Sequence, residues 1–317
     1  MATSESISTG EGITYTLKST ELERSNLRPL TRTRSFGRKR TMEIERPWAS
    51  LMGDLMADVF RRLPFEELLK TVPLVCKAWR TACHSSACWK DVDMRPWIKN
   101  KCELNYGWEF DCKEEMEDAL KLVVDRSHGQ LRSLRTMFCS NESLEYIAKN
   151  CPLLVELSIT ESFYVEDESA LLLAENCRLL KSLDLSDCYR LTARSLEMFG
   201  RNCCGLIRFS RNMLRSHEFD GLDLPDGDQE AVAISSHMRG LKHLELKRSL
   251  SLTDSGLMHI ASGCRELESL DLACCSSVSP RGLEKVSALC LKLKSFVKPI
   301  NPRISVSTKL NGWMLWD

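Results

Sequence analysis

Apolar residues recur with a fixed period along the second half of the chain. Successive leucines stand 26 residues apart in four of five intervals, and each follows a cysteine, or once a methionine, by three positions. These leucines are Leu154, Leu180, Leu206, Leu241, Leu267 and Leu293. A fixed period in this range is typical of a solenoid, in which each repeat buries its apolar face only against its neighbours. Because solenoids present long binding surfaces, the pattern indicates a protein that recognises another protein.

Each repeat is expected to hold one short strand and one helix. The clearest repeats open with L-x-x-L-x-L, as from Leu180, and the last two leucines alternate as in a strand with one buried face. A polar turn follows, and residues 255–261 then show apolar positions at helical spacing. Thr253 or Asp254 is suited to cap that helix, and Ser279 with Pro280 forms a similar start in the next repeat. The sequence therefore predicts an α/β fold with repeats over residues 127–300.

Polar residues between the buried leucines should point to the concave, solvent side of the strands. We treat them as the candidate surface for a protein ligand. They are Ser133, Arg135, Glu156, Ser158, Ser182, Asp184, Arg208, Ser210, His243, Glu245, Ser269 and Asp271. They are mixed in charge and include few aromatic residues, so they specify no ligand chemistry. An ordinary solvated sheet would show the same pattern.

One repeat is longer than the others. The interval between Leu206 and Leu241 is 35 residues, nine more than the period, and its residues 216–230 are acidic and rich in Gly, Asp and Pro. Insertions in repeats map to surface loops, often on a binding face. A tolerated, solvated loop is the alternative, because long insertions cost little closure entropy.

Residues 46–93 carry a second, compact pattern. Four apolar residues at four-residue spacing predict one helical stripe, which Pro64 should end; they are Leu51, Leu55, Val59 and Leu63. The apolar residues of a second and a third short helix are Phe65, Leu68 and Leu69, then Val75, Cys76 and Trp79. So small a module has more apolar surface than it can bury, which favours docking to a partner.

This segment resembles an F-box. The resemblance rests on L-P-F-E-E-L-L at 63–69, V-x-x-V-C-K-A-W-R at 72–80 and C-W-K-D-V-D at 88–93. The usual opening Leu-Pro of the family is missing, and Trp48-Ala-Ser-Leu51 stands in its place, an opening most similar to plant members. The repeats resemble the cysteine-containing subclass of leucine-rich repeats, which is a known companion of the F-box.

The resemblance implies that the F-box binds a Skp-type adaptor, through which the cullin and RING subunits of an SCF-type ubiquitin ligase assemble. The repeats would then bind a protein substrate for ubiquitination and proteasomal degradation, in the nucleus or the cytoplasm. By position, the adaptor surface would comprise Leu51, Leu55, Val59, Leu63, Pro64, Leu68, Leu69, Val75, Cys76 and Trp79. Val75 and Trp79 have the alternative role of holding the three helices together.

Two other functions stay open. A leucine-rich-repeat scaffold or inhibitor without ligase assembly would account for the missing Leu-Pro. A receptor gated by a small molecule would resemble plant relatives that bind hormones within their repeats, although a solenoid of roughly six or seven repeats argues against an enclosed pocket.

Composition and motifs exclude several other classes of function. Lys+Arg and Asp+Glu are both 44, so no net field points to nucleic acid, and no apolar run is long enough to span a membrane. The sequence shows no nucleophile–base pair, phosphate loop or zinc-type C-x-x-C, so we expect a non-catalytic chain without metal or cofactor. Most of the 15 cysteines fall at repeat positions, where a small buried side chain suits the stack.

Three flanking segments complete the expected organisation. Residues 1–45 are poor in apolar side chains and predict a disordered tail. Its basic cluster at 24–40 is a nuclear import signal, a phosphorylation region or a plain flexible tail. Residues 94–126 predict a helical connector, and residues 301–317 predict a tail or a cap on the last repeat.

Overall fold

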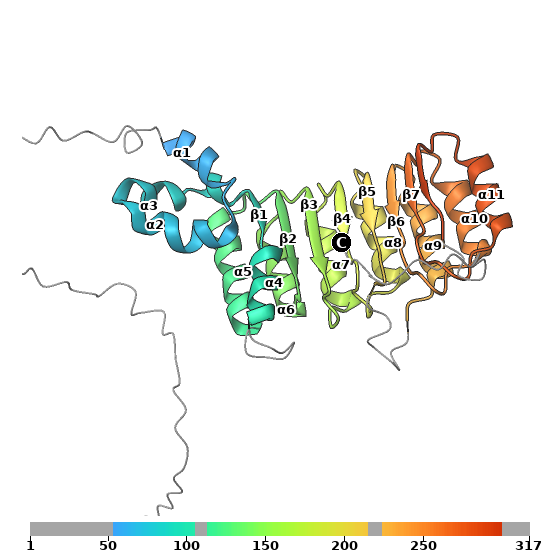
Figure 1. Ribbon diagram of the computed structural model, residues 1–317, viewed down its shortest axis with the longest axis horizontal. Helices are drawn as coiled ribbons and strands as arrows, with labels where there is room; N and C mark the ends of the chain where they lie inside the picture. The colour runs from blue at the N-terminus through green and yellow to red at the C-terminus, as the bar shows by residue number, and fades with distance from the viewer. Residues whose placement is uncertain (1–52, 105–112, 215–223, 300–317) are drawn as a thin grey trace, which may run out of the picture. The chain divides into compact units, whose positions relative to one another are not determined.

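The computed structural model describes residues 53–104, 113–214 and 224–299 (Figure 1). The predicted tail at 1–45, the candidate residue Leu51, part of the acidic insertion and the predicted cap at 301–317 lie outside the described residues. Predictions about these segments therefore stay predictions.

Within the described part, a parallel sheet runs through the chain with its strands in sequence order. The strands are β1 (Asp91–Asp93), β2 (Ser133–Met137), β3 (Glu156–Thr160), β4 (Ser182–Asp184), β5 (Arg208–Ser210), β6 (His243–Glu245), β7 (Ser269–Asp271) and β8 (Ser295–Val297). The second residue of each repeat strand is apolar and stands in register with its neighbours, as Leu157 does with Leu183 and Leu183 with Phe209. These second residues are buried from β2 to β7, which confirms the strand that L-x-x-L-x-L predicts.

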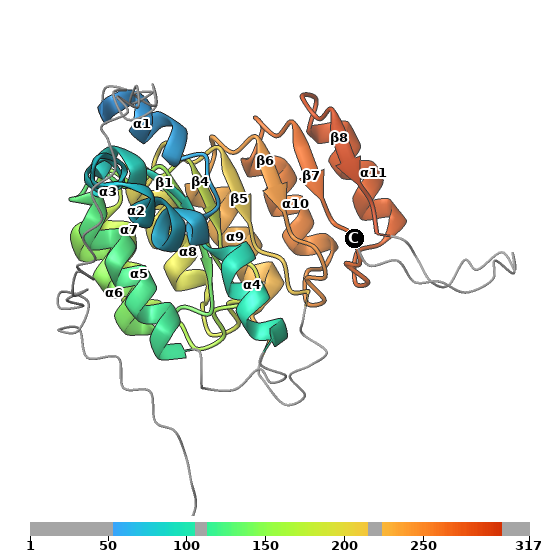
Figure 2. The ribbon, with the colours of Figure 1, turned by 60° about the vertical axis from the view of Figure 1, so that its left-hand side comes forward.

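A row of helices covers one face of this sheet (Figures 1 and 2). They are α6 (Asn141–Asn150), α7 (Asp167–Asn176), α8 (Ala193–Asn202), α9 (Gly227–His237), α10 (Asp254–Gly263) and α11 (Pro280–Leu289). As predicted, Thr253 caps α10 through its side chain, and Ser279 caps α11 with Pro280 in its first turn. The α/β fold with one strand and one helix per repeat is therefore confirmed.

The repeat cysteines tie neighbouring repeats together. The thiol of Cys177 donates to the carbonyl of Cys151, and the thiol of Cys203 donates to the carbonyl of Cys177, each at 3.4 Å. Burial raises the pKa of Cys177 to about 12, so the thiol keeps the proton that it donates. Met238 occupies the same position in the long repeat, and its thioether has no proton to donate.

The F-box region is a set of short helices: α1 (Gly53–Phe60), a π-helical turn (Glu67–Thr71), α2 (Val72–Val75), α3 (Lys77–Cys83) and a 3₁₀ turn (Ser86–Trp89). The predicted helix end at Pro64 is wrong, because α1 ends at Phe60. The backbone amides of Arg62 and Leu63 donate to carbonyls three residues earlier, so the chain forms a tight turn here. Pro64 disfavours helical geometry in Leu63, the residue before it. The predicted third helix is likewise two helices, since Cys76 is extended (φ −162°, ψ 171°).

The F-box and the repeats share one sheet and one core. The closing motif of the F-box supplies β1, which pairs with β2 so that Val92 stands opposite Leu134. The predicted connector forms α4 (Arg95–Leu104) and α5 (Lys113–Ser127), and α5 packs on α6. Buried apolar residues make one continuous core from Met56 to Cys290. The sequence boundary at residue 93 is therefore not a break in the fold.

Candidate functional site

The F-box exposes apolar side chains on α1 and α2. Leu55 and Val59 on α1 are 53% and 55% exposed, and Leu74 and Val75 on α2 are 77% and 54% exposed. The opposite face of α1 buries Met56, Ala57 and Phe60 in the core. The stripe that the sequence spacing identifies is thus the outward face of α1, and exposed apolar groups of this kind mark interaction surfaces.

The other candidate residues of the F-box differ in exposure. Leu63, Pro64 and Cys76 are exposed, whereas Leu69 and Trp79 are half-buried. Leu68 is 3% exposed and belongs to the core, so it supports the surface without presenting a side chain to a partner.

Of Val75 and Trp79, only Trp79 has the alternative role of holding the F-box helices together. The ring of Trp79 lies 5.0 Å from that of Phe60, so Trp79 does hold the helices together. Val75 is exposed, and a core role for it is wrong because its side chain faces solvent. The spacing argument missed Leu74, which lies in α2 between Pro73 and Val75 and belongs to no regular spacing of apolar residues.

Strand pairing brings the candidate residues of the repeats together in two parallel rows. The first row runs through Ser133, Glu156, Ser182, Arg208, His243 and Ser269. The second row runs through Arg135, Ser158, Asp184, Ser210, Glu245 and Asp271. Neighbouring strands are about 4.8 Å apart, so an extended ligand across the strands would meet one residue of each row per strand.

Charges within the rows are largely paired. Arg135 holds both oxygens of Glu156 at 2.8 Å, and Ser133 donates to the same carboxylate at 2.9 Å. Lys247, just beyond β6, lies 3.2 Å from Glu245 and 3.3 Å from Asp271. Burial opposes its charge, but these carboxylates outweigh burial and raise the pKa of Lys247.

Arg208 differs from these charges. It is exposed on β5, in register with His243 on β6, and has no ion-pair partner among the described residues. Of the two rows, this position offers a ligand the most available positive charge.

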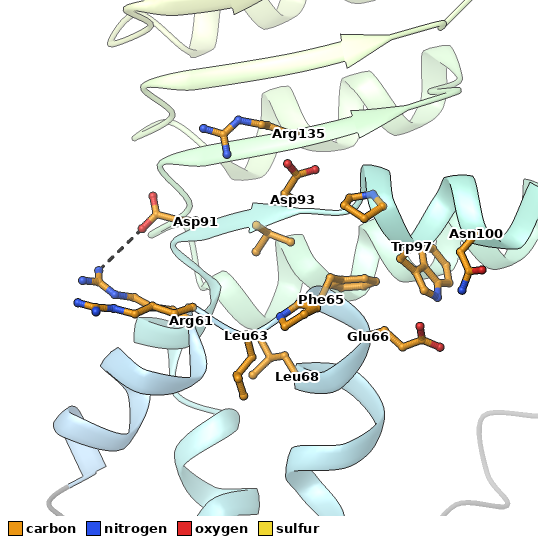
Figure 3. A pocket seen from close by; sticks show the side chains of 14 residues that line it. Arg61, Leu63, Phe65, Glu66, Leu68, Asp91, Asp93, Trp97, Asn100 and Arg135 are labelled. Atoms are coloured by element: carbon orange, nitrogen blue, oxygen red, sulfur yellow. Dashed lines mark ion pairs between the residues drawn. The ribbon is translucent and has the colours of Figure 1, made fainter. Parts of the chain in front are cut away.

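A pocket of about 680 Å³ lies where the F-box meets the first strands (Figure 3). Figure 3 shows Arg61 and Asp91 at one end, joined by an ion pair of 3.8 Å, and Glu66 and Asn100 at the other. Arg135 of the second row also lines the pocket, which therefore opens beside the concave surface. Its volume is within the range of ligand sites, about 300–1,000 Å³.

Two aromatic residues line the pocket, of which sequence reasoning named Phe65 only as an apolar residue of the second F-box helix and did not name Trp97. Phe65 of the F-box and Trp97 of α4 meet edge to face, with ring centroids 5.3 Å apart. Asp93 on β1 takes a two-pronged hydrogen bond from Arg95, at 3.0 and 2.6 Å. Although burial opposes it, this guanidinium lowers the pKa of Asp93. A tryptophan four residues after the closing F-box motif was the available signal.

Two searches within the described ranges bear on chemistry. No group of three or more His, Cys, Asp and Glu side chains there is placed to hold a metal ion. None of the helices there is long and apolar enough to cross a membrane.

Comparisons with known proteins agree with the F-box and with the repeats. Residues 54–95 match the F-box-like family. The F-box protein SKIP1 of Arabidopsis thaliana is 34% identical over 68% of this chain and 75% of its own length. The F-box protein FBW2 of the same plant is 32% identical over 63% of this chain and 60% of its own length. F-box/LRR-repeat protein 9 of that plant is 30% identical over 69% of this chain and 83% of its own length.

Two of these relatives, at 34% and 30% identity, are covered by this chain over 75% and 83% of their own length. The chain therefore belongs to the F-box/LRR-repeat family of plants.

Proposed function

We propose that this protein is the substrate-recognition subunit of an SCF-type E3 ubiquitin ligase. The F-box docks a Skp-type adaptor, and through it the cullin and RING subunits. The repeats bind a protein substrate, which the assembled ligase marks for proteasomal degradation. The chain itself contributes binding and orientation, not catalysis.

The observation that carries this proposal is the exposed apolar face of the folded F-box. Leu55, Val59, Leu74 and Val75 are each more than half exposed, although full burial of such a side chain is worth about 1.5–3 kcal/mol. A partner that covers α1 and α2 recovers that free energy. The family membership supports an adaptor as the partner.

The shared sheet supports the second half of the proposal. Because β1 pairs with β2, a substrate on the concave rows is held in a fixed orientation relative to the F-box. A ligase accelerates transfer by keeping the substrate lysine near the charged ubiquitin carrier, which is an effective-concentration effect. A flexible joint would dilute that effect.

The test is a pulldown of a purified Skp-type adaptor by the full-length chain. The double substitution Leu74→Asp/Val75→Asp should weaken binding by at least about 30-fold, since one interface anchor is worth about 2 kcal/mol. Leu289→Asp/Leu291→Asp, at the far end of the repeats, changes two exposed residues in the same way and should bind as the wild type does. Helical circular dichroism checks that both variants fold.

Two results would oppose the proposal: a folded wild-type chain that captures no adaptor, or a Leu74→Asp/Val75→Asp variant that captures it undiminished. The second candidate would then lead, a leucine-rich-repeat scaffold or inhibitor that assembles no ligase. The observation in its favour is the opening Trp48-Ala-Ser-Leu51, which replaces the Leu-Pro of the family.

Location in the nucleus, the cytoplasm or both belongs to the same proposal. A fluorescent fusion of the full chain, compared with one lacking residues 24–40, tests whether the basic cluster directs nuclear import.

A further inference from the structure

The pocket between the F-box and the first strands is assembled from segments far apart in the sequence (Figure 3). Leu63 and Phe65 come from the F-box, Trp97 from α4, Asp93 from β1 and Arg135 from β2. Half of the 14 lining residues are charged or polar, and Leu63 with the edge-to-face rings of Phe65 and Trp97 forms an apolar part of the wall. That apolar part suits a large apolar side chain.

Trp97 carries a buried donor that lacks a partner. The residue is 4% exposed, and its indole nitrogen has no hydrogen-bond acceptor among the described residues. Trp89 shows the usual arrangement, since its own indole nitrogen donates to the carbonyl of Cys83 at 2.7 Å. Buried tryptophan N–H groups normally find a partner, so the donor of Trp97 calls for an acceptor from outside the described chain.

Figure 3 shows where that acceptor would lie. The nitrogen edge of the Trp97 ring is turned toward the end of the pocket that holds Glu66 and Asn100. Asn100 is exposed, so a ligand can displace its side chain. The indole nitrogen is itself buried, and a carbonyl oxygen that enters from this end would reach it once the Asn100 side chain has moved aside.

Most charges around the opening already have partners. Asp93 is bound to Arg95, Arg135 to Glu156, and Glu66 to Lys70 at 2.9 Å. A highly charged ligand would have to break these pairs, whereas a peptide backbone with an apolar side chain leaves them intact. Because Asp93 and Arg135 lie at the start of the concave sheet, a chain that leaves the pocket continues onto the two rows.

We propose that this pocket is the first subsite for a peptide segment of the protein substrate. A large apolar side chain of the peptide packs against Phe65 and Trp97, and a backbone carbonyl accepts the indole hydrogen of Trp97. The assignment rests on the proposed function only in naming the peptide as part of a ligase substrate.

The first experiment pans a phage-displayed library of short random peptides against the full-length chain. Enriched peptides should share a large apolar or aromatic residue. Their binding should be lost in Asn100→Trp, which fills the pocket from its rim, and kept in Lys99→Trp, the exposed neighbour on the same helix outside the pocket. Absence of enrichment, or equal binding to both variants, would overturn the proposal.

The second experiment uses Trp97→Phe, which keeps one ring but removes the indole donor together with part of a buried side chain. The free variant should melt at a lower temperature because of the lost packing, so its melting temperature shows only that it is folded at the assay temperature. Its affinity for an enriched peptide should fall at least about 3-fold, because it loses one neutral hydrogen bond and part of the aromatic wall. In the wild type, peptide should also shift the indole ¹H–¹⁵N resonance that Trp97→Phe deletes.

Either of two results in that experiment would contradict the assignment. An indole resonance that the peptide leaves unshifted would mean that the Trp97 donor meets no peptide carbonyl. An unchanged peptide affinity would mean that the indole does not bind peptide. A chain that captures the adaptor but fails these tests loses the subsite and keeps the proposed ligase function, so the two failures are distinguishable.

Discussion

Replacing Arg211 by methionine should destabilise the repeats by about 3–5 kcal/mol, although the change places an apolar side chain in an apolar core. Arg211 follows β5 at the inward position that Leu185, Leu246 and Leu272 hold in other repeats. It is 0% exposed and pairs with Glu230 in the first turn of α9, which is 4% exposed. A charge pair therefore replaces a leucine in the one repeat that carries the insertion.

The size of the expected loss of stability follows from the hydrogen bonds that Arg211 makes. Its guanidinium donates to the carboxylate of Glu230 at 3.0 Å. It also donates to the carbonyls of Leu185, Cys188 and Leu191 in the preceding repeat, at 3.0, 2.8 and 2.8 Å. Removing it leaves a buried carboxylate without a counter-charge, which is the costly half of breaking a buried pair. The carbonyl of Leu191 also loses a donor.

The double variant Arg211→Met/Glu230→Leu separates charge from packing. With both charges gone, stability should return to within about 1–3 kcal/mol of the wild type. The remaining loss comes from the backbone carbonyls that no longer have a hydrogen-bond donor. The matched control is Arg194→Met, which removes an exposed Arg–Glu pair of 3.2 Å and should cost under about 1 kcal/mol. Urea unfolding followed by circular dichroism measures all three variants.

The pH dependence of the stability of Arg211→Met tests the same reasoning independently. Burial raises the pKa of the Glu230 carboxyl, and Arg211 opposes the rise. Without Arg211 the folded chain binds this proton more tightly than the unfolded chain does, so acid stabilises the folded state. The deficit of Arg211→Met should therefore shrink between about pH 7.5 and about pH 5, and the double variant should lack this trend. A loss for Arg211→Met no larger than that of Arg194→Met would refute the reasoning.

Two smaller predictions concern packing within the repeats. Gly256→Ala should lower stability by about 1–3 kcal/mol, because the added Cβ would clash with Oδ1 of Asp228. Gly205→Ala is the control, since a Cβ there would have its nearest neighbour at 3.7 Å, and it should be tolerated. Thermal melts of both variants measure the difference. Ellman's reagent should modify exposed Cys204 long before buried Cys177, whose raised pKa keeps it a thiol. Mass spectrometry identifies which cysteine has reacted, and equal rates would contradict the burial of the repeat cysteines.

The repeats were open to prediction from the sequence because their signals are local. Each L-x-x-L-x-L places its own strand, and each Ser or Thr cap begins its own helix, so an error in one repeat does not spread. The stripe of Leu55 and Val59 was found by the same means, as four-residue spacing marks one face of a helix. Spacing alone cannot tell whether that face is buried, and here it faces solvent.

The features that escaped prediction depend on contacts across the chain. Arg211 lies next to the insertion, where the repeat register is hardest to assign, and a lone arginine there gives no sign that Glu230 will reach it. β1 is three residues with two aspartates, so only its pairing with β2, some 40 positions away, makes it a strand. The pocket of Phe65 and Trp97 arises from that same pairing and has no local pattern of its own.

The pairing of β1 with β2 also makes the two ends of the concave sheet unequal under the proposed function. Neighbouring strands are about 4.8 Å apart, so Arg208 on β5 lies about 19 Å across the sheet from β1. A substrate anchored in the pocket is held beside the F-box, whereas one anchored only at Arg208 and His243 is held four strands away. Since transfer depends on the effective concentration of the substrate lysine, the choice of anchor selects which lysines come within reach. If the chain binds its substrate as proposed, the continuous sheet would contribute to specificity, because each binding position on it corresponds to a distance from the F-box.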